Sequence, residues 1–276
     1  MLQRSESKRG REGHMLGAAY LSAFPLGLLV SGAAVLGAVI GSFLGASLVR
    51  LPEGRSVVSG RSACDGCGKA LTIAELVPVL SWLVQRGKCR ACGVRIGGWQ
   101  LACELGGGAV GVGSVLLARE GLVLAGMLFG WQLLLLALLD LRHLWLPRVL
   151  VGLLAGTGLA VVFARAWSIQ GMDPVLVSLG GGALGYLMLW AIARFYLKAR
   201  GREGMGAGDP PLLGAIGIWV GPLGVVEVML GASILGIAVA IVMLVSRRNI
   251  AADTALPLGT CLAATAWPIF LLQGLG

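Results

Sequence analysis

Long apolar segments recur along the chain, and they constrain its fold more than any other feature. About eight such runs are separated by segments that hold most of the charged residues. Most runs are near 20 residues long, enough for a helix to cross about 30 Å of hydrocarbon. Charged residues make up 13% of the chain, against about 25% in an ordinary soluble domain. We therefore expect an all-α polytopic membrane protein embedded in a lipid bilayer.

The apolar runs predict about eight transmembrane helices, the sixth of them short and interrupted by glycine and proline. The expected spans cover residues 24–49, 99–118, 121–139, 149–167, 174–197, 211–220, 223–245 and 256–275. A long polar segment, residues 50–98, separates the first span from the second. Four parts follow from this pattern: an N-terminal tail (1–23), a region with the first two spans (24–118), a membrane domain (119–250) and a C-terminal span (251–276).

Basic residues outnumber acidic ones, which gives a formal net charge of +9. The basic clusters in 50–98, 140–148, 198–202 and 247–248 all fall on one side of an eight-span protein, which predicts that this side is cytoplasmic. No basic stripe with interleaved aromatic residues is present, so we expect no nucleic-acid partner. The N-terminal tail is also basic yet falls on the opposite side. A translation start at Met15 instead of Met1 would explain this.

Two C-x-x-C pairs lie in the polar segment, Cys64 with Cys67 and Cys89 with Cys92. Two tight turns of this kind can place four thiolates at the corners of a tetrahedron, an arrangement that suits structural Zn²⁺. Two disulfides or four free thiols are the alternatives, and a reducing cytoplasm disfavours disulfides. We expect zinc to hold folded a small segment that cannot build a large core.

Two aspartates stand at the ends of apolar runs: Asp140 closes the third span and Asp209 opens the sixth. A single acid in such a place can simply mark where a span meets water, although ionisable residues inside a bundle are candidates for function. Two neighbouring carboxylates share a proton, so one can act as a base on water while the other polarises a carbonyl. The pair therefore indicates acid–base hydrolysis of an amide.

Glycines alternate with other residues just ahead of Asp209, at Gly204, Gly206 and Gly208. Because glycine carries no side chain, these positions would let an extended peptide lie close to the backbone beside the acid. We expect them to line the approach of a substrate.

These residues resemble a known family. The stretch "GMGAGD" (204–209) resembles the G-x-G-D motif of intramembrane aspartyl proteases and, more closely, that of the type IV prepilin peptidases. Three other stretches are similar to motifs of that family: "GSFLGASLVRLP" (41–52), the four cysteines around "ELVPVLSWL", and "LLDLRHLWLP" (138–147). The resemblance covers residues 41–217 in order, and the later spans fit its eight-helix plan.

The resemblance implies a membrane aspartic endopeptidase with Asp140 and Asp209 as its catalytic pair and residues 119–250 as its peptidase domain. It implies cleavage of the leader of type IV prepilins or type II secretion pseudopilins, after a glycine, at the cytoplasmic face of the bacterial inner membrane. Many members with the four cysteines then methylate the new N-terminus with S-adenosylmethionine. A bifunctional enzyme would therefore need both structural zinc and S-adenosylmethionine.

Three positions depart from the family pattern: Arg148 replaces a frequent acid, Pro211 a usual lysine and Gly45 a frequent asparagine. Glu104 falls where the family often has a glutamate. Three roles are open for it: contact with the polar segment, contact with S-adenosylmethionine, or helix packing. Two alternatives stay open: a peptidase without methyl transfer, and a transporter or membrane scaffold with a zinc-stapled loop.

Overall fold

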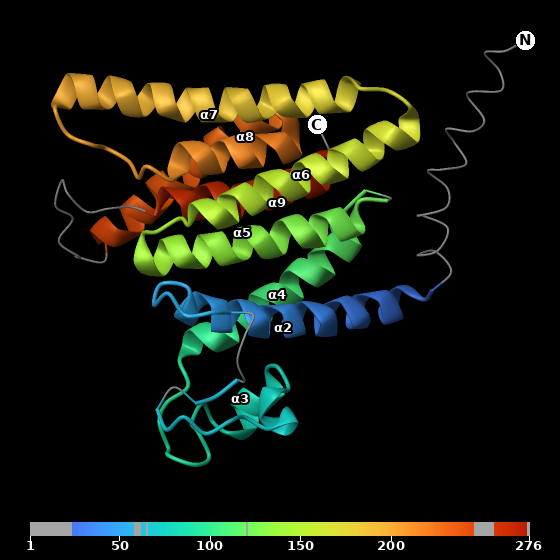
Figure 1. Ribbon diagram of the computed structural model, residues 1–276, viewed down its shortest axis with the longest axis vertical. Coiled ribbons are helices and arrows are strands. Elements are labelled where there is room, and N and C mark those ends of the chain that lie inside the picture. The colour runs from blue at the N-terminus through green and yellow to red at the C-terminus, as the bar shows by residue number, and fades with distance from the viewer. Residues whose placement is uncertain (1–23, 58–61, 65, 120, 246–256, 275–276) are drawn as a thin grey trace, which may run out of the picture. The chain divides into compact units, whose positions relative to one another are not determined.

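The computed structural model describes residues 24–57, 62–64, 66–119, 121–245 and 257–274 (Figure 1). Over these residues the chain forms eight α-helices and one short 3-10 helix, with two isolated β-bridges and no strand. The N-terminal tail and the basic pair at 247–248 lie outside the described residues. The helices divide into two compact units, an N-terminal unit (Phe24–Leu116) and a C-terminal unit that begins at Leu117.

All eight predicted spans are helical, and the expected all-α membrane architecture is confirmed. Six helices are long and apolar enough to cross a bilayer, and α9 (Leu258–Gln273) is a shorter apolar helix. The six are α2 (Leu26–Arg50), α4 (Gly98–Leu117), α5 (Val123–His143), α6 (Arg148–Ile169), α7 (Asp173–Arg200) and α8 (Asp209–Val245). The predicted sixth and seventh spans are the two parts of α8. They meet at Gly221, whose φ of 70° breaks the helix just before Pro222.

In the N-terminal unit, α2 and α4 approach each other at glycines. A methyl group added at Gly37 would come within 2.2 Å of the Gly107 carbonyl oxygen, so the two backbones are almost in contact. The polar segment between these helices contains the 3-10 helix η1 (Ile73–Leu76) and the short helix α3 (Leu80–Val84). Antiparallel bridges join Ala63 to Ala70 and Lys88 to Arg95, and each closes a loop around one C-x-x-C pair.

The C-terminal unit places α5, α6, α7, α8 and α9 side by side (Figure 1). The most extensive packing joins α7 to α8, where the two backbones meet at Gly181 and Gly217. An aromatic cluster fills the core: Phe129 stacks on Trp219 with ring centroids 4.7 Å apart, and Phe270 meets both rings edge-on. This cluster fixes α9, at the end of the chain, against α5 and α8.

Candidate active site and metal centre

Asp140 lies in the last turn of α5, a position set by the way this helix ends. Leu144 adopts a left-handed backbone (φ 48°), and the chain then turns through Pro147 into α6. The Asp140 side chain is buried, and its Oδ2 accepts a 2.7 Å hydrogen bond from the backbone N–H of Thr260. The Thr260 hydroxyl lies 3.1 Å from the same oxygen. The C-terminal helix α9 therefore holds a carboxylate that α5 presents.

Asp209 is the first residue of α8 and is also buried. Its Oδ2 accepts a 3.1 Å hydrogen bond from the backbone N–H of Gly206, and its own N–H donates back to the Gly206 carbonyl at 3.2 Å. This reciprocal turn orients the side chain at the start of the helix. A carboxylate in the first turn also interacts favourably with the helix dipole.

The structure places the two predicted aspartates in the same unit, at the end of α5 and at the start of α8. Leu146 links their surroundings, because a methyl group at Gly208 would come within 2.8 Å of Leu146 Cβ. A methyl group at Gly259 would meet both Leu146 Cδ1 and Asp140 Oδ2 at 3.0 Å. The ends of four helices, α5, α6, α8 and α9, thus converge on this carboxylate pair.

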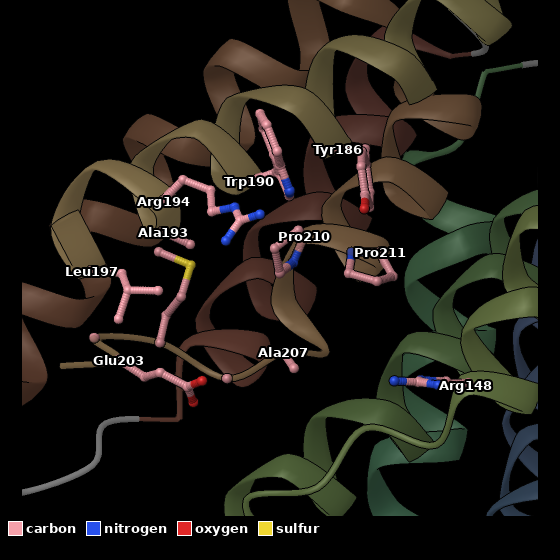
Figure 2. A pocket seen from close by; sticks show the side chains of 13 residues that line it. Arg148, Tyr186, Trp190, Ala193, Arg194, Leu197, Glu203, Ala207, Pro210 and Pro211 are labelled. Atoms are coloured by element: carbon pink, nitrogen blue, oxygen red, sulfur yellow. The ribbon is translucent and has the colours of Figure 1, made fainter. Parts of the chain in front are cut away.

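Two cavities adjoin the glycine-rich segment ahead of Asp209. The first, of about 440 Å³, lies between one face of α7 and residues 203–211, and Figure 2 shows its lining side chains. The second, of about 350 Å³, lies between α6 and the start of α8. Gly204 and Gly206 line the first cavity and Gly208 lines the second. All three predicted glycines therefore border space beside Asp209.

The same glycines also make room for neighbouring side chains. A methyl group at Gly204 would lie 2.5 Å from the Tyr196 ring, and one at Gly206 would lie 3.3 Å from Asp209 Oδ2. None of the three, Gly208 included, has a positive φ. These positions therefore favour glycine because a larger side chain would crowd its neighbours, and not because the backbone adopts an unusual conformation.

Two of the positions that depart from the family pattern, Arg148 and Pro211, line both cavities together. Figure 2 shows the Arg148 side chain at the edge of the first cavity, below Pro211, with Arg194 on the opposite side. The Arg194 guanidinium lies over the Trp190 ring, 5.7 Å from its centroid. Positive charge is therefore present at this cavity although Pro211 offers none.

The four predicted cysteines, Cys64, Cys67, Cys89 and Cys92, form one cluster in the N-terminal unit. Their sulfur atoms all lie within 4.8 Å of one another, and the Sγ atoms of Cys64 and Cys92 are 3.8 Å apart. Zn²⁺ binds thiolates at about 2.3 Å in tetrahedral geometry, which separates the sulfurs by about 3.8 Å. No disulfide joins these cysteines. The cluster fits a four-thiolate metal centre.

Backbone groups prepare one of these thiols for metal binding. The backbone N–H groups of Cys92 and Ala91, with smaller contributions from the thiols of Cys64 and Cys92, lower the pKa of the Cys89 thiol to about 6. The thiolate is the form that binds metal, so this arrangement favours a ligand. Cys103 and Cys261 are buried in α4 and α9 and take no part in the cluster.

Glu104 is buried in α4 and contacts the polar segment, as one of the interpretations of the sequence anticipated. Its two carboxylate oxygens accept hydrogen bonds from the backbone N–H of Val79 at 2.7 Å and from Gln100 Nε2 at 2.9 Å. Val79 has a φ of 62°, which a β-branched residue rarely adopts. The carboxylate thus holds a strained turn just ahead of α3.

Thr260, which no sequence pattern indicates as a functional residue, touches Asp140 across 120 positions of the chain. In the sequence, Thr260 lies in "PLGTC", an ordinary helix start whose first residue is Pro257. Nothing local to this stretch identifies a partner on α5.

The chain is similar in sequence to known proteins. A family model described as "Type IV leader peptidase family" matches residues 127–241, and one described as "Bacterial Peptidase A24 N-terminal domain" matches residues 35–117. The chain is 34% identical to a "Prepilin leader peptidase/N-methyltransferase" of Burkholderia pseudomallei, with 96% of each chain covered. It is 32% identical to a protein of the same name in Pseudomonas aeruginosa, with 92% of this chain and 93% of that protein covered. No solved structure matches the chain.

A relative with a different name is similar to the same degree. It is the "Type 4 prepilin-like proteins leader peptide-processing enzyme" of Escherichia coli, which is 33% identical over 88% of this chain and 94% of that protein.

Proposed function

Because the chain belongs to the type IV leader peptidase family, we propose that it removes the leader of type IV prepilins or type II secretion pseudopilins, with Asp140 and Asp209 as catalytic residues. One observation carries this proposal: two buried carboxylates from different helices lie in one unit with Leu146 next to the surroundings of both, and separate elements hold each of them. We expect cleavage to occur after a glycine.

The two carboxylates together can hydrolyse a peptide bond with water as the nucleophile. An ionised aspartate removes a proton from water as the water oxygen attacks the scissile carbonyl carbon, and the protonated partner donates its proton to the carbonyl oxygen. Collapse of the resulting diol breaks the C–N bond. The leaving nitrogen takes up the proton held by the first aspartate, and a diol hydroxyl returns its proton to the second aspartate. No covalent enzyme intermediate forms in this scheme.

The two cavities support a path for the substrate chain. Gly206 both borders the first cavity and holds the Asp209 carboxylate, so a peptide in that cavity would lie against the backbone that positions the acid. Gly208 and Pro211 border the second cavity on the other side of this segment. We propose that residues on the two sides of the scissile bond occupy the two cavities.

The position of the basic residues supports a cytoplasmic active site in the inner membrane. Arg148 begins α6, and Lys198 and Arg200 lie in the last turn of α7. Asp140 and Asp209 lie at the corresponding ends of α5 and α8. Because basic residues concentrate on the cytoplasmic side of membrane proteins, a leader that remains in the cytoplasm would reach the pair from that side.

A second activity, N-methylation of the new N-terminus, is suggested by the names of the relatives. We propose that residues 24–118 carry it, with structural Zn²⁺ held by Cys64, Cys67, Cys89 and Cys92. The metal would fix the fold of the polar segment, because four thiolates leave no open position for chemistry. S-adenosylmethionine would supply the methyl group. Mass spectrometry of the processed N-terminus decides this point, since an unmethylated product from enzyme supplied with S-adenosylmethionine would remove the activity.

Cleavage of candidate prepilins in detergent by Asp140→Asn and Asp209→Asn tests the peptidase. Because the pair acts as a unit, each substitution alone should lower kcat by at least about 100-fold. Asp173→Asn is the matched control, since Asp173 is an exposed acid that begins α7 as Asp209 begins α8. Normal cleavage by either variant of the pair would refute the assignment. Cleavage of no candidate by the wild type would favour the transporter or scaffold alternative.

A further inference from the structure

We infer that Thr260 is a positioning residue for Asp140, so that the C-terminal helix α9 is part of the catalytic unit. The inference rests on the proposed peptidase function. Helix α9 begins at Leu258, after the end of the region that matches the peptidase family model, residues 127–241. The part of the chain that matches this family model therefore ends before α9.

Thr260 makes three close polar contacts, all of them with the last turns of α5. Its backbone N–H donates to Asp140 Oδ2 at 2.7 Å. Its Oγ1 lies 3.1 Å from the same oxygen and 2.9 Å from the carbonyl oxygen of Ala137. One residue thus connects the Asp140 side chain to the backbone one turn earlier in the same helix. This restricts the carboxylate to one orientation.

The hydroxyl of Thr260 fits both protonation states that hydrolysis requires of Asp140. A hydroxyl has one hydrogen to donate and two lone pairs to accept with. When Asp140 is ionised, the hydroxyl donates to Oδ2. When Oδ2 carries a proton, Asp140 donates to the hydroxyl, which turns its own hydrogen to the Ala137 carbonyl. Oδ2 can therefore stay in place while the proton comes and goes.

The surroundings of Thr260 make it a firm support. Gly259 leaves space for the carboxylate, because a methyl group at this position would lie 3.0 Å from Asp140 Oδ2. Further along α9, Phe270 packs against Phe129 and Trp219, and Trp267 Nε1 donates to the Gly126 carbonyl at 3.0 Å. A side chain held by packed neighbours on a rigid helix positions a catalytic group better than one on a loop.

Kinetics of the full-length protein in detergent, with a type IV prepilin that carries a glycine-terminated leader as substrate, test this role. Thr260→Val keeps the shape and the backbone N–H but removes the hydroxyl. Loss of a hydrogen bond to a charged group corresponds to a fall in rate of about 10- to 100-fold. We therefore expect kcat to fall by that factor, while KM stays within about twofold of the wild type. Thr260→Ser restores the hydroxyl and should bring kcat back to within about threefold of the wild type.

Thr265→Val is the matched control on the same helix. The Thr265 hydroxyl is also partly buried and bonds to backbone carbonyls, those of Cys261, Leu262 and Val228, but not to Asp140. Its loss should lower the unfolding temperature without changing kcat. Gly259→Ala provides an independent variant, which crowds Asp140 while the Thr260 hydroxyl remains, and it too should lower kcat more than it changes KM.

Three results would overturn the inference while leaving the peptidase function intact: wild-type kcat in Thr260→Val, no recovery in Thr260→Ser, or an equal loss of kcat in Thr265→Val. If Thr260→Val does not fold, Gly259→Ala and Thr260→Ser decide, and wild-type kcat in Gly259→Ala overturns the inference. If the wild type leaves the prepilin uncut, the proposed function fails and the inference fails with it.

Discussion

The backbone N–H of Val79 donates a 2.7 Å hydrogen bond to the Glu104 carboxylate, and this contact fixes the polar segment to α4. Val79 precedes α3 with a positive φ of 62°, so the bond holds a turn that a β-branched residue disfavours. The carboxylate belongs to α4, and the turn that it holds lies in the chain between the two C-x-x-C pairs. Its loss should therefore loosen the segment that carries the cysteines.

We expect Glu104→Gln to destabilise the N-terminal unit by about 1–3 kcal/mol, because the new amide nitrogen would face either the Val79 N–H or the Gln100 amide. Thermal unfolding in detergent measures the loss, and hydrogen exchange over residues 73–84 locates it. Glu53→Gln is the control, since Glu53 is an exposed acid paired with Arg55 at 2.5 Å. A surface pair of this kind contributes about 0–1 kcal/mol. Equal effects of the two substitutions would contradict the role given to Glu104.

Metal removal gives a second prediction. Purified protein should contain about one zinc ion per chain, and a chelator should make residues 62–97 sensitive to protease because the metal holds this segment folded. Cys67→Ser should lose the ion, since Cys67 is one of the four clustered ligands. Cys103→Ala should retain it, because Cys103 is buried in α4 and outside the cluster. Metal analysis that finds no zinc in the wild type, or a loss in Cys103→Ala, would count against the site.

The helices and the acids of this protein could be predicted from the sequence because both depend on local patterns. A segment in lipid must satisfy its own backbone, so a long apolar run indicates a helix wherever it occurs. Asp140 and Asp209 stand out because acids are rare in such runs. The break in α8 also has a local cause, in the sequence Gly221–Pro222.

The contacts between helices could not be predicted in this way. Thr260 meets Asp140, and Phe270 meets Phe129, only because α9 packs against α5. Many glycines in the chain would allow close helix packing, so composition does not select the pairs that meet. The positive φ at Val79 could not be predicted either, since its support comes from Glu104, 25 positions further along the chain.

Two adjacent glycines in α7 separate the effect of helix packing from that of helix propensity. Replacing either with alanine favours a helix by about 0.5–1 kcal/mol. At Gly180 the nearest atom to an added methyl group is Pro222 Cγ at 4.0 Å, so Gly180→Ala should be neutral or stabilising. At Gly181 the methyl group would lie 2.3 Å from the Gly217 carbonyl oxygen, a backbone atom that only a shift of α8 can move. Gly181→Ala should therefore destabilise by about 1–3 kcal/mol.

Unfolding temperatures of the two α7 variants in the same detergent measure this difference. A Gly181→Ala variant as stable as Gly180→Ala would mean that α7 and α8 do not pack at these glycines.

The glycines ahead of Asp209 allow a graded test of how tightly the site is held. A methyl group at Gly208 would meet Leu146 Cβ at 2.8 Å, and Leu146 also lies beside Gly259 and Asp140. A methyl group at Gly206 would meet the end of the Asp209 side chain at 3.3 Å, which a small shift can relieve. Displacement of a catalytic group by about 1 Å can cost about 100-fold in rate. We expect kcat to fall about 10- to 100-fold in Gly208→Ala and less in Gly206→Ala.

Gly156→Ala in α6 is the control for this series, because nothing lies within 4 Å of a methyl group at that position. Its kcat should equal that of the wild type, and its unfolding temperature should rise slightly with the gain in helix propensity. Prepilin cleavage rates of the three variants, measured with unfolding temperatures, separate loss of fold from loss of geometry. The reverse order, with Gly206→Ala more impaired than Gly208→Ala, would show that Leu146 does not transmit the disturbance to the two acids.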